Sequence, residues 1–341
     1  MVDRRAVLIT GGAGYLGRRI AEQYRSTTDL DVVLHTRSEG DLTSDEPFEA
    51  ISAADRDRVV QIVHSAAVTR FNVDAETADR VNVDGTRRVV EFARTCPGLE
   101  RLALLSTVYA SGLRSGPVAE MVLDGSAGFA NHYERSKWEA EQVVTESGLP
   151  WQVLRIATIV ADDERGGVTQ YNAFHTTLRL CFYGLLSVLP GKASTPLYLV
   201  TGDFVAEAVA DLVSRGEPGV HHLCHRREES TTLGEAIATA FEVFAQDDEF
   251  ARKGILPPLL ADEESFGIMA AGIETFGGEV VSQAMRTVSP FGPQLYIDKD
   301  IENANLRAAR NDYRAPDARV LVRRVACQLV DTRWGRHVAV V

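Results

Sequence analysis

The chain has 341 residues, of which 45% are hydrophobic and 25% charged, and this suits one large globular domain or two fused smaller ones. Its formal net charge of −12 at pH 7 argues against nucleic acid as a partner, because neutralising phosphates requires clustered lysine and arginine. The four cysteines are widely spaced without a C-x-x-C pair, which predicts reduced thiols. No signal peptide or long apolar run is visible in the sequence. We therefore expect a cytoplasmic protein that does not contact membranes.

The first seventeen residues are the most informative stretch. The apolar run 6–10 leads into glycines at positions 11, 14 and 17, a G-x-x-G-x-x-G spacing, and then into a predicted helix over about 15–25. Glycine allows a tight turn and a close backbone approach, and the start of a helix offers unpaired N–H groups. This arrangement is typical of a site for the pyrophosphate of a dinucleotide.

The rest of the first half continues as alternating strands and helices. Strands are expected at 31–35, 59–64, 101–106 and 151–156, and helices at about 47–54, 76–95 and from Asn131 to 147. Such alternation predicts an α/β fold with a doubly wound parallel sheet. After about residue 160 the alternation loosens, leaving a helix at 203–215, a strand at 220–224 and a helix at 232–246.

A second motif, Y-x-x-x-K, falls within the helix that begins near Asn131. Tyr133 and Lys137 lie four residues apart and so share one helix face. A nearby lysine charge favours the phenolate and is expected to lower the pKa of the tyrosine. The pair alone is equally typical of an exposed helix surface, but its position downstream of a phosphate-binding turn favours a catalytic role.

Together these motifs resemble the extended short-chain dehydrogenase/reductase family, and most closely its branch of thioester reductase domains and fatty acyl-CoA reductases. The resemblance covers about residues 6–225 and rests on segments 10–17, 64–67, 81–86, 106–109 and 131–141. It implies a Rossmann fold in which residues 1–160 bind NADP and residues 161–341 mainly form a smaller substrate-binding lobe. The helix at 203–215 is expected to return to the nucleotide domain.

The resemblance also implies a Thr/Tyr/Lys catalytic site. Tyr133 would protonate a carbonyl oxygen as hydride reaches the carbon, and Thr107 would hydrogen-bond that oxygen. Lys137 would hold the nicotinamide ribose and depress the pKa of Tyr133. Ser106 is a rival for the hydroxyl role, which the register of the strand decides.

The residues implied in cofactor binding cluster at the glycine turn, at the ends of the following strands and on the catalytic helix. Asn82 is expected to fix the active-site helix, with helix capping as the alternative, and Ile156 stands where the family often has proline. The full set is Gly11, Gly14, Tyr15, Leu16, Gly17, Arg37, Asp41, Leu42, Ala66, Ala67, Asn82, Tyr133, Lys137, Ile156 and Thr158.

Cofactor choice depends on the end of the second strand. The segment His35–Ser38 contains Arg37 and no acid, which favours the 2′-phosphate of NADPH, with NADH as the alternative. Arg18 is a second candidate, and both arginines could instead be solvated. Gly40-Asp41-Leu42 follows this strand almost at once. Either the family's third strand is therefore vestigial, or Asp41 lies away from its usual adenine-binding place.

The leading functional hypothesis is an NADPH-dependent reductase of a carbonyl or of an acyl thioester, either free as acyl-CoA or bound to a carrier protein. The alternatives are a nucleotide-sugar epimerase or dehydratase and a non-catalytic NADP-sensing protein. His221, His222 and His225 lie on a predicted strand whose side chains alternate between faces, so no metal site is expected there. His175 is expected to pack rather than to touch substrate, and the family often forms homodimers.

Overall fold

The computed structural model describes residues 5–276, 278–310 and 313–335. Its centre is a sheet of six parallel strands in the order β11-β6-β4-β3-β1-β2. This confirms the predicted doubly wound α/β fold. The strands are β1 (Ala6–Thr10), β2 (Asp31–His35), β3 (Val59–His64), β4 (Arg101–Thr107), β6 (Trp151–Ile156) and β11 (Gly219–Leu223).

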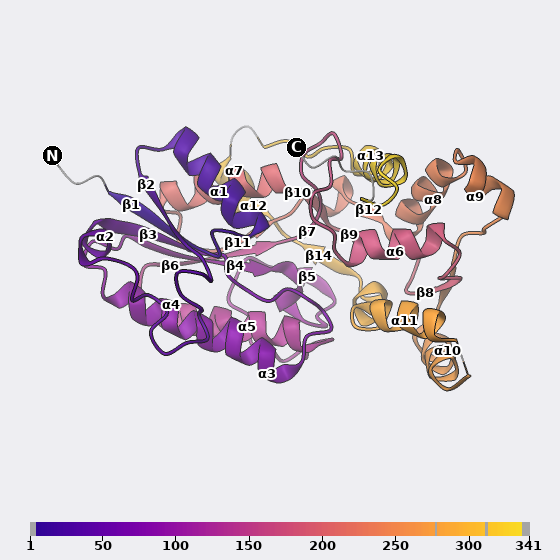
Figure 1. Ribbon diagram of the computed structural model, residues 1–341, viewed down its shortest axis with the longest axis horizontal. Coiled ribbons are helices and arrows are strands. Elements are labelled where there is room, and N and C mark those ends of the chain that lie inside the picture. The colour runs from indigo at the N-terminus through magenta and orange to yellow at the C-terminus, as the bar shows by residue number, and fades with distance from the viewer. Residues whose placement is uncertain (1–4, 277, 311–312, 336–341) are drawn as a thin grey trace.

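Helices cover both faces of this sheet (Figure 1). On one face lie α4 (Gly85–Arg94) and α5 (His132–Thr145), and on the other lie α1 (Tyr15–Thr27) and α7 (Gly202–Arg215). The apolar sides of α1 and α7 are buried in one core with β1. Both faces of the strands are therefore shielded from water, as expected for near-continuous apolar strands in a parallel sheet.

Two of the expected helices differ from the sequence prediction. The helix expected at 47–54 is wrong: residues 47–50 form turns, and α2 spans Ala53–Arg58, because Ser52 caps it by accepting a hydrogen bond from the Asp55 amide. The helix expected at 76–95 is present but not uniform. It comprises α3 (Ala75–Ala78), a π-helical segment η1 (Asp79–Asp84) and α4.

The family's third strand is missing from the described sheet, in which β2 pairs with β1 alone. The chain instead folds back after β2, where His35 Nε2 donates a hydrogen bond to the Pro47 carbonyl oxygen at 2.7 Å. A Cβ on Gly40 would lie 1.8 Å from that same oxygen, so only glycine fits this close approach. This agrees with the vestigial-strand alternative, and the adenine-binding place of Asp41 stays a prediction.

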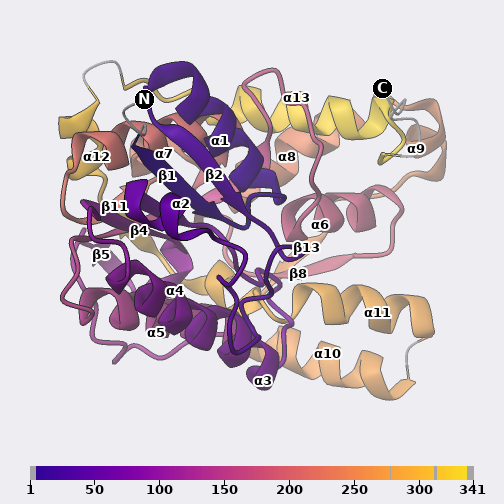
Figure 2. The ribbon, with the colours of Figure 1, turned by 60° about the vertical axis from the view of Figure 1, so that its left-hand side comes forward.

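Beyond the sheet, a second body is built around its own apolar core. Figure 2 shows α8 (Leu233–Phe244) beside α13 (Ala318–Asp331), with α10 (Glu263–Phe276) beside α11 (Glu279–Val288). The other lobe helices are α6 (Ala173–Phe182) and α9 (Asp248–Lys253). Short strand pairs complete the fold: β5 (Gly116–Val118) with β14 (Lys299–Ile301), β7 (Thr158–Ala161) with β10 (Leu199–Thr201), β8 (Val188–Pro190) with β13 (Leu259–Ala261), and β9 (Pro196–Leu197) with β12 (Thr231–Thr232).

The chain crosses between the two bodies more often than the sequence suggested. Helix α7 packs with the sheet core, as expected, but so do β11, β14 and α12 (Ala304–Ala309), which sequence alone assigned to the lobe. The division near residue 160 stays a prediction. Among the described residues, every helix falls short of the length and apolarity that a membrane crossing requires.

Candidate active site

A cavity of about 750 Å³ lies along the carboxyl ends of β1, β3, β4 and β6 and extends between α6 and α8 of the lobe. Its wall contains fourteen of the sixteen catalytic and cofactor-binding residues that the sequence put forward. Asn82 and Gly17 lie behind the wall, and Arg18 is an exposed residue that does not line the cavity. The carboxyl end of a parallel sheet is where ligands bind in open α/β folds.

The glycine turn can accommodate a dinucleotide because its backbone is packed too tightly for side chains. Gly11 has a φ of +68°, and a Cβ there would lie 2.9 Å from the Ala66 backbone. A Cβ on Gly17 would lie 2.2 Å from the Gly11 carbonyl oxygen. Gly17 therefore supports the turn from behind, while Gly11 and Gly14 face the cavity.

Helix α1 begins beside the cavity without a side-chain cap and without an acid in its first turn. Its first N–H groups and the positive end of its dipole are thus available to an anion. Tyr15 and Leu16 line the wall at this point. The Tyr15 hydroxyl donates to Asp162 Oδ1 at 2.8 Å, which ties the helix start to the loop entering the lobe.

The far end of the cavity is lined by Thr36, Arg37, Asp41 and Leu42. The Arg37 side chain is 83% exposed, and its Nε lies 3.7 Å from Asp41 Oδ2. Hydrogen bonds from Thr43 and the Arg37 charge hold the pKa of Asp41 below its usual value. The sequence interpretation missed Glu39, whose carboxylate accepts hydrogen bonds from the Thr36 amide and hydroxyl at 2.8 Å. An acid does therefore lie beside the end of β2.

Ala66 and Ala67 follow β3 and form the cavity floor. Asn82, from η1, supports this loop: its Oδ1 accepts from the Val68 amide at 2.8 Å, and its Nδ2 donates to the Val68 carbonyl at 3.0 Å. The same Nδ2 donates to Ser136 Oγ on α5 at 2.9 Å. Asn82 therefore fixes the catalytic helix, as the resemblance implied, and the helix-cap alternative is wrong, since α4 has no side-chain cap.

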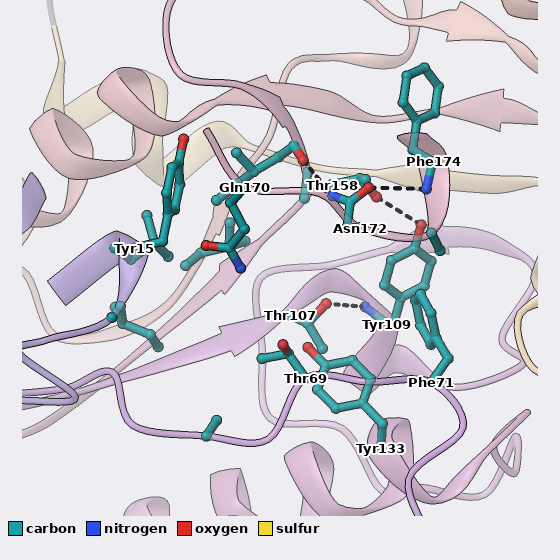
Figure 3. Close-up of a pocket in the computed structure, with 18 of the residues that line it drawn as sticks. Tyr15, Thr69, Phe71, Thr107, Tyr109, Tyr133, Thr158, Gln170, Asn172 and Phe174 are labelled. Carbon is teal, nitrogen blue, oxygen red and sulfur yellow. Dashed lines mark hydrogen bonds between the residues drawn. The ribbon is translucent and has the colours of Figure 1, made fainter. Parts of the chain in front are cut away.

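The side chains of Thr107, Tyr133 and Thr69 lie close to one another in the cavity, with the hydroxyl groups of Tyr133 and Thr69 side by side (Figure 3). Thr107 Oγ1 accepts from the Tyr109 amide at 3.3 Å, which leaves its own hydrogen free to donate. Thr158 lines the wall above them and shares a 3.0 Å hydrogen bond with the Tyr109 hydroxyl, and Ile156 lines it from β6.

The pKa of Tyr133 is raised, contrary to the expectation that Lys137 would depress it. Burial is the main cause, and the hydrogen bond with Thr107 opposes it. Lys137 is itself buried and donates from Nζ to the Leu105 carbonyl at 2.7 Å. Burial lowers the pKa of Lys137 to about 8, against the opposing charge of Glu141. Without a ligand, the phenol is therefore protonated near neutral pH.

Ser106 and Thr107 are separated by the alternation of the strand. Ser106 Oγ donates to Glu141 Oε1 at 2.5 Å, on the side of β4 that faces α5. Glu141 also accepts from Arg155, with Nη2 at 2.7 Å from Oε2 and Nε at 3.0 Å from Oε1. Both side chains of this ion pair are almost entirely buried. The hydroxyl of Ser106 is thus occupied, whereas Thr107 lines the cavity beside Tyr133.

Several lining residues were not found by sequence reasoning. Thr69 and Phe71 follow the recognised H-S-A-A segment directly, so that motif could have been extended to them. Many of the others come from the lobe, where no motif marks them. The lobe contributes many apolar residues to the wall: Val168, Ala173, Phe174, Leu178, Cys181, Leu189, Leu197, Leu199, Leu233, Ala236, Ile237, Phe241, Phe291 and Leu295.

The histidines near β11 contact separate partners. His222 Nδ1 donates to the Glu302 carbonyl at 2.7 Å, His221 bonds the Glu217 carbonyl, and His225 bonds Tyr313. Groups of three or more side chains placed to bind a metal are absent from the described part of the chain. His175 closes the first turn of α6 as part of a capping box, which matches the expected packing role.

Comparison with known proteins agrees with this architecture. Residues 44–209 match the model of the male sterility protein family. Fatty acyl-CoA reductase wat of Drosophila melanogaster is 25% identical over 265 residues, covering 58% of this chain and 50% of that protein. A carboxylic acid reductase of Segniliparus rugosus is 31% identical over 189 residues, covering 48% of this chain and 16% of that protein. The chain thus spans half or less of these relatives' length.

Among solved structures, the terminal R domain from the myxalamid PKS-NRPS biosynthetic pathway superposes with a TM-score of 0.75. The superposition covers 98% of this chain and 92% of the domain, with 18% sequence identity. At this identity the likeness shows a shared fold and nothing more. The matched residues include Tyr133 and Lys137 of α5. Residues 44–209 are thus similar to the male sterility protein family, and the chain has the fold of the myxalamid R domain.

Proposed function

We propose that this chain is a nicotinamide-dependent reductase that acts on acyl thioesters or on the corresponding aldehydes. The observation that carries the proposal is the position of Thr107 and Tyr133 in one cavity, between a glycine turn on one side and an apolar wall on the other. The glycine turn suits a dinucleotide, and the apolar wall suits a non-polar acyl group. The hydroxyl groups lie where these two halves meet.

When bound, the dinucleotide supplies a hydride to the carbonyl carbon of the substrate. Tyr133 donates its phenolic proton to the carbonyl oxygen, and its raised pKa keeps that proton in place until it is needed. Thr107 donates a hydrogen bond to the same oxygen and stabilises the charge developing on it. With a thioester, the C–S bond then breaks, the thiol leaves, and an aldehyde remains.

Lys137 has two roles in this proposal. Its ammonium group, anchored on the Leu105 carbonyl, would hold the ribose hydroxyls of the dinucleotide. Its positive charge would also stabilise the Tyr133 phenolate after proton transfer. Because the pKa of Lys137 is lowered to about 8, this charge is lost as the pH rises through about 8. Turnover should therefore fall on the alkaline side.

The lobe side of the cavity favours a hydrophobic acyl group. Apart from Asp162 at the entry to the lobe, its lining residues within the described chain carry no charged side chain, and α6 and α8 both contribute aliphatic side chains. Each buried methylene contributes about 0.8 kcal/mol of binding, or roughly fourfold in affinity. A series of acyl thioesters from acetyl to octanoyl should therefore show kcat/KM rising by up to about fourfold per methylene until the cavity is filled.

NADPH is the preferred cofactor in this proposal. Arg37 lines the cavity and can pair with a 2′-phosphate through its planar guanidinium. Glu39 opposes this preference, since its carboxylate holds the Thr36 amide that could otherwise bind a phosphate. Arg37→Ala should weaken NADPH binding and leave NADH binding unchanged, measured by fluorescence titration of both. Equal affinities of the wild-type protein for the two cofactors would contradict the preference.

The test of the function is a substrate panel in which NADPH oxidation is followed by absorbance. For UDP-glucose, whose epimerisation or dehydration consumes no NADPH, the products are followed by chromatography instead. The panel contains a medium-chain acyl thioester as its CoA and carrier-protein forms, the matching aldehyde, and UDP-glucose. We expect turnover of the thioester and the aldehyde. Turnover of the aldehyde alone would reduce the proposal to a carbonyl reductase. Activity on UDP-glucose, or NADPH binding without any turnover, would replace it with a sugar-nucleotide enzyme or an NADP-sensing protein.

A further inference from the structure

A buried carboxylate directly follows the catalytic tyrosine. Glu134 is 0% exposed although it lies in the first turn of α5. Its Oε2 accepts from the Ala130 amide at 3.0 Å and from Gln294 Nε2 at 2.9 Å, and its Oε1 accepts from Asn131 Nδ2 at 3.1 Å. A carboxylate buried to this degree is costly unless its oxygens are bonded, so this arrangement needs an explanation.

One partner of Glu134, Gln294, belongs to a segment of the lobe that forms one wall of the cavity. Phe291, Gln294 and Leu295 line the cavity, and the Phe291 ring lies 5.8 Å from the Phe71 ring, which in turn lies 5.6 Å from the Tyr133 ring. The amide of Asn131, the cap of α5, also donates to the Pro290 carbonyl at 3.0 Å. The start of the catalytic helix is therefore bonded to this wall at two places.

A buried lysine completes the cluster. Lys299, on β14, is 6% exposed, and its Nζ donates to the Gly112 carbonyl at 2.6 Å and to Ser111 Oγ at 3.0 Å. Gln294 Nε2 donates to the same Gly112 carbonyl at 3.2 Å. Lys299 also provides the positive charge that favours the ionised form of Glu134. The lobe segment 290–299 thus brings both a bonded amide and a counter-charge to the start of α5.

We propose that Glu134 is a positioning residue that holds the lobe wall formed by Phe291 and Leu295 in register with Tyr133. Through Gln294 it sets the distance between this wall and the reacting hydroxyl group, and through Asn131 it fixes the first turn of the helix that carries Tyr133. It does not touch the substrate itself. The contacts of Glu134 do not depend on what the substrate is. Only the kinetic tests of this inference rest on the proposed reductase function.

The ionised form of Glu134 is the one that accepts these hydrogen bonds. Burial raises its pKa, while the Ala130 amide and Lys299 lower it. The titratable groups facing it are Lys299 of β14, Tyr109 of the short helix Val108–Ser111 and its neighbour Tyr133. Because a raised carboxyl pKa brings protonation closer to neutrality, substrate binding should weaken as the pH falls through this pKa. Removing the Lys299 charge should move that loss to higher pH.

The kinetic test uses Glu134→Gln, with the exposed Glu146→Gln at the end of the same helix as the matched control. The glutamine NH2 must face a donor in either orientation, that of Gln294 or that of Asn131. We therefore expect KM for the aldehyde to rise about tenfold, the effect of losing one charge-assisted hydrogen bond. The NADPH affinity should stay within about twofold of the wild-type value. The fall of kcat/KM at low pH (its acid limb), which follows protonation of Glu134, should disappear. Lys299→Met should instead shift that limb to higher pH.

The second measurement needs no turnover. Amide hydrogen exchange across residues 288–299 should accelerate about tenfold or more in Glu134→Gln and remain unchanged in Glu146→Gln. An unchanged KM and acid limb, or unchanged exchange in this segment, would overturn the inference even if the variant is less stable. If the wild-type protein reduces no carbonyl or thioester, the proposed function fails, while the exchange result still decides the role of Glu134.

Discussion

The buried ion pair between Glu141 and Arg155 offers the sharpest stability prediction. Arg155 is 0% exposed, and its guanidinium makes a two-point contact with the carboxylate, with Nη2 2.7 Å from Oε2 and Nε 3.0 Å from Oε1. Glu141→Gln keeps the shape but leaves a buried cation without a counter-charge. Breaking a buried pair in this way costs about 3–5 kcal/mol, several times the cost of an exposed pair.

The same substitution should alter the active site. The negative charge of Glu141 raises the pKa of Lys137, which burial has already lowered to about 8. Removing that charge should lower the Lys137 pKa further, so the alkaline limb of kcat should move to lower pH. Ser106 can then donate only to a neutral amide oxygen instead of a carboxylate, so this bond should weaken and loosen the end of β4, which carries Thr107.

Equilibrium urea unfolding of Glu141→Gln measures the effect on stability. The pH profile of kcat measures the shift of its alkaline limb. The control is Glu139→Gln, whose half-exposed pair with Arg135 should contribute less than about 1 kcal/mol. The double variant Glu141→Leu/Arg155→Met should recover much of the stability, because an apolar pair of similar volume needs no desolvation. A loss below about 1 kcal/mol in Glu141→Gln, with an unchanged alkaline limb, would refute this reasoning.

Two further predictions concern the cofactor turn and the sheet beneath it. Gly17→Ala places a Cβ 2.2 Å from the Gly11 carbonyl oxygen, so NADPH binding measured by calorimetry should weaken at least tenfold, whereas Gly267→Ala, on an open helix face, should leave it unchanged. Burial lowers the pKa of His64 to about 3, so the folded state takes up fewer protons than the unfolded chain between about pH 3 and 6.5, and stability falls as the pH drops below 6.5. Lowering the pH from 7.5 to 5.5 should therefore cost about 1.4 kcal/mol of unfolding free energy through this residue. Urea unfolding should show that His64→Gln lacks this loss. An equal pH dependence of stability in the two proteins would contradict the prediction.

The nucleotide-binding half was readable from sequence because local chemistry determines it. The strands at 6–10, 31–35, 59–64 and 151–156 are short apolar runs bounded by turns, and the structure has them at the same residues. The helix expected at 47–54 failed because the cap at Ser52 starts α2 later. In the first half, errors arose mainly where the chain departs from its family, after β2.

The lobe could not be read in the same way. Its core joins helices far apart in sequence, such as α6, α8 and α13, and their apolar faces carry no spacing that says which partner they meet. The pKa of Tyr133 was also misjudged, because burial in the assembled cavity raises it, and burial cannot be read from a four-residue motif. Glu134 and Gln294 meet across 160 residues and only the fold brings them together.

The central claim is that Tyr133 protonates a substrate carbonyl in this cavity. The measurement that tests it most directly is single-turnover NADPH oxidation by Tyr133→Phe with a medium-chain acyl thioester, beside a titration of NADPH binding. General acid catalysis contributes about 10²–10⁴-fold, so the rate should fall by that factor while NADPH affinity stays within about twofold. A variant that keeps the wild-type rate would contradict the account.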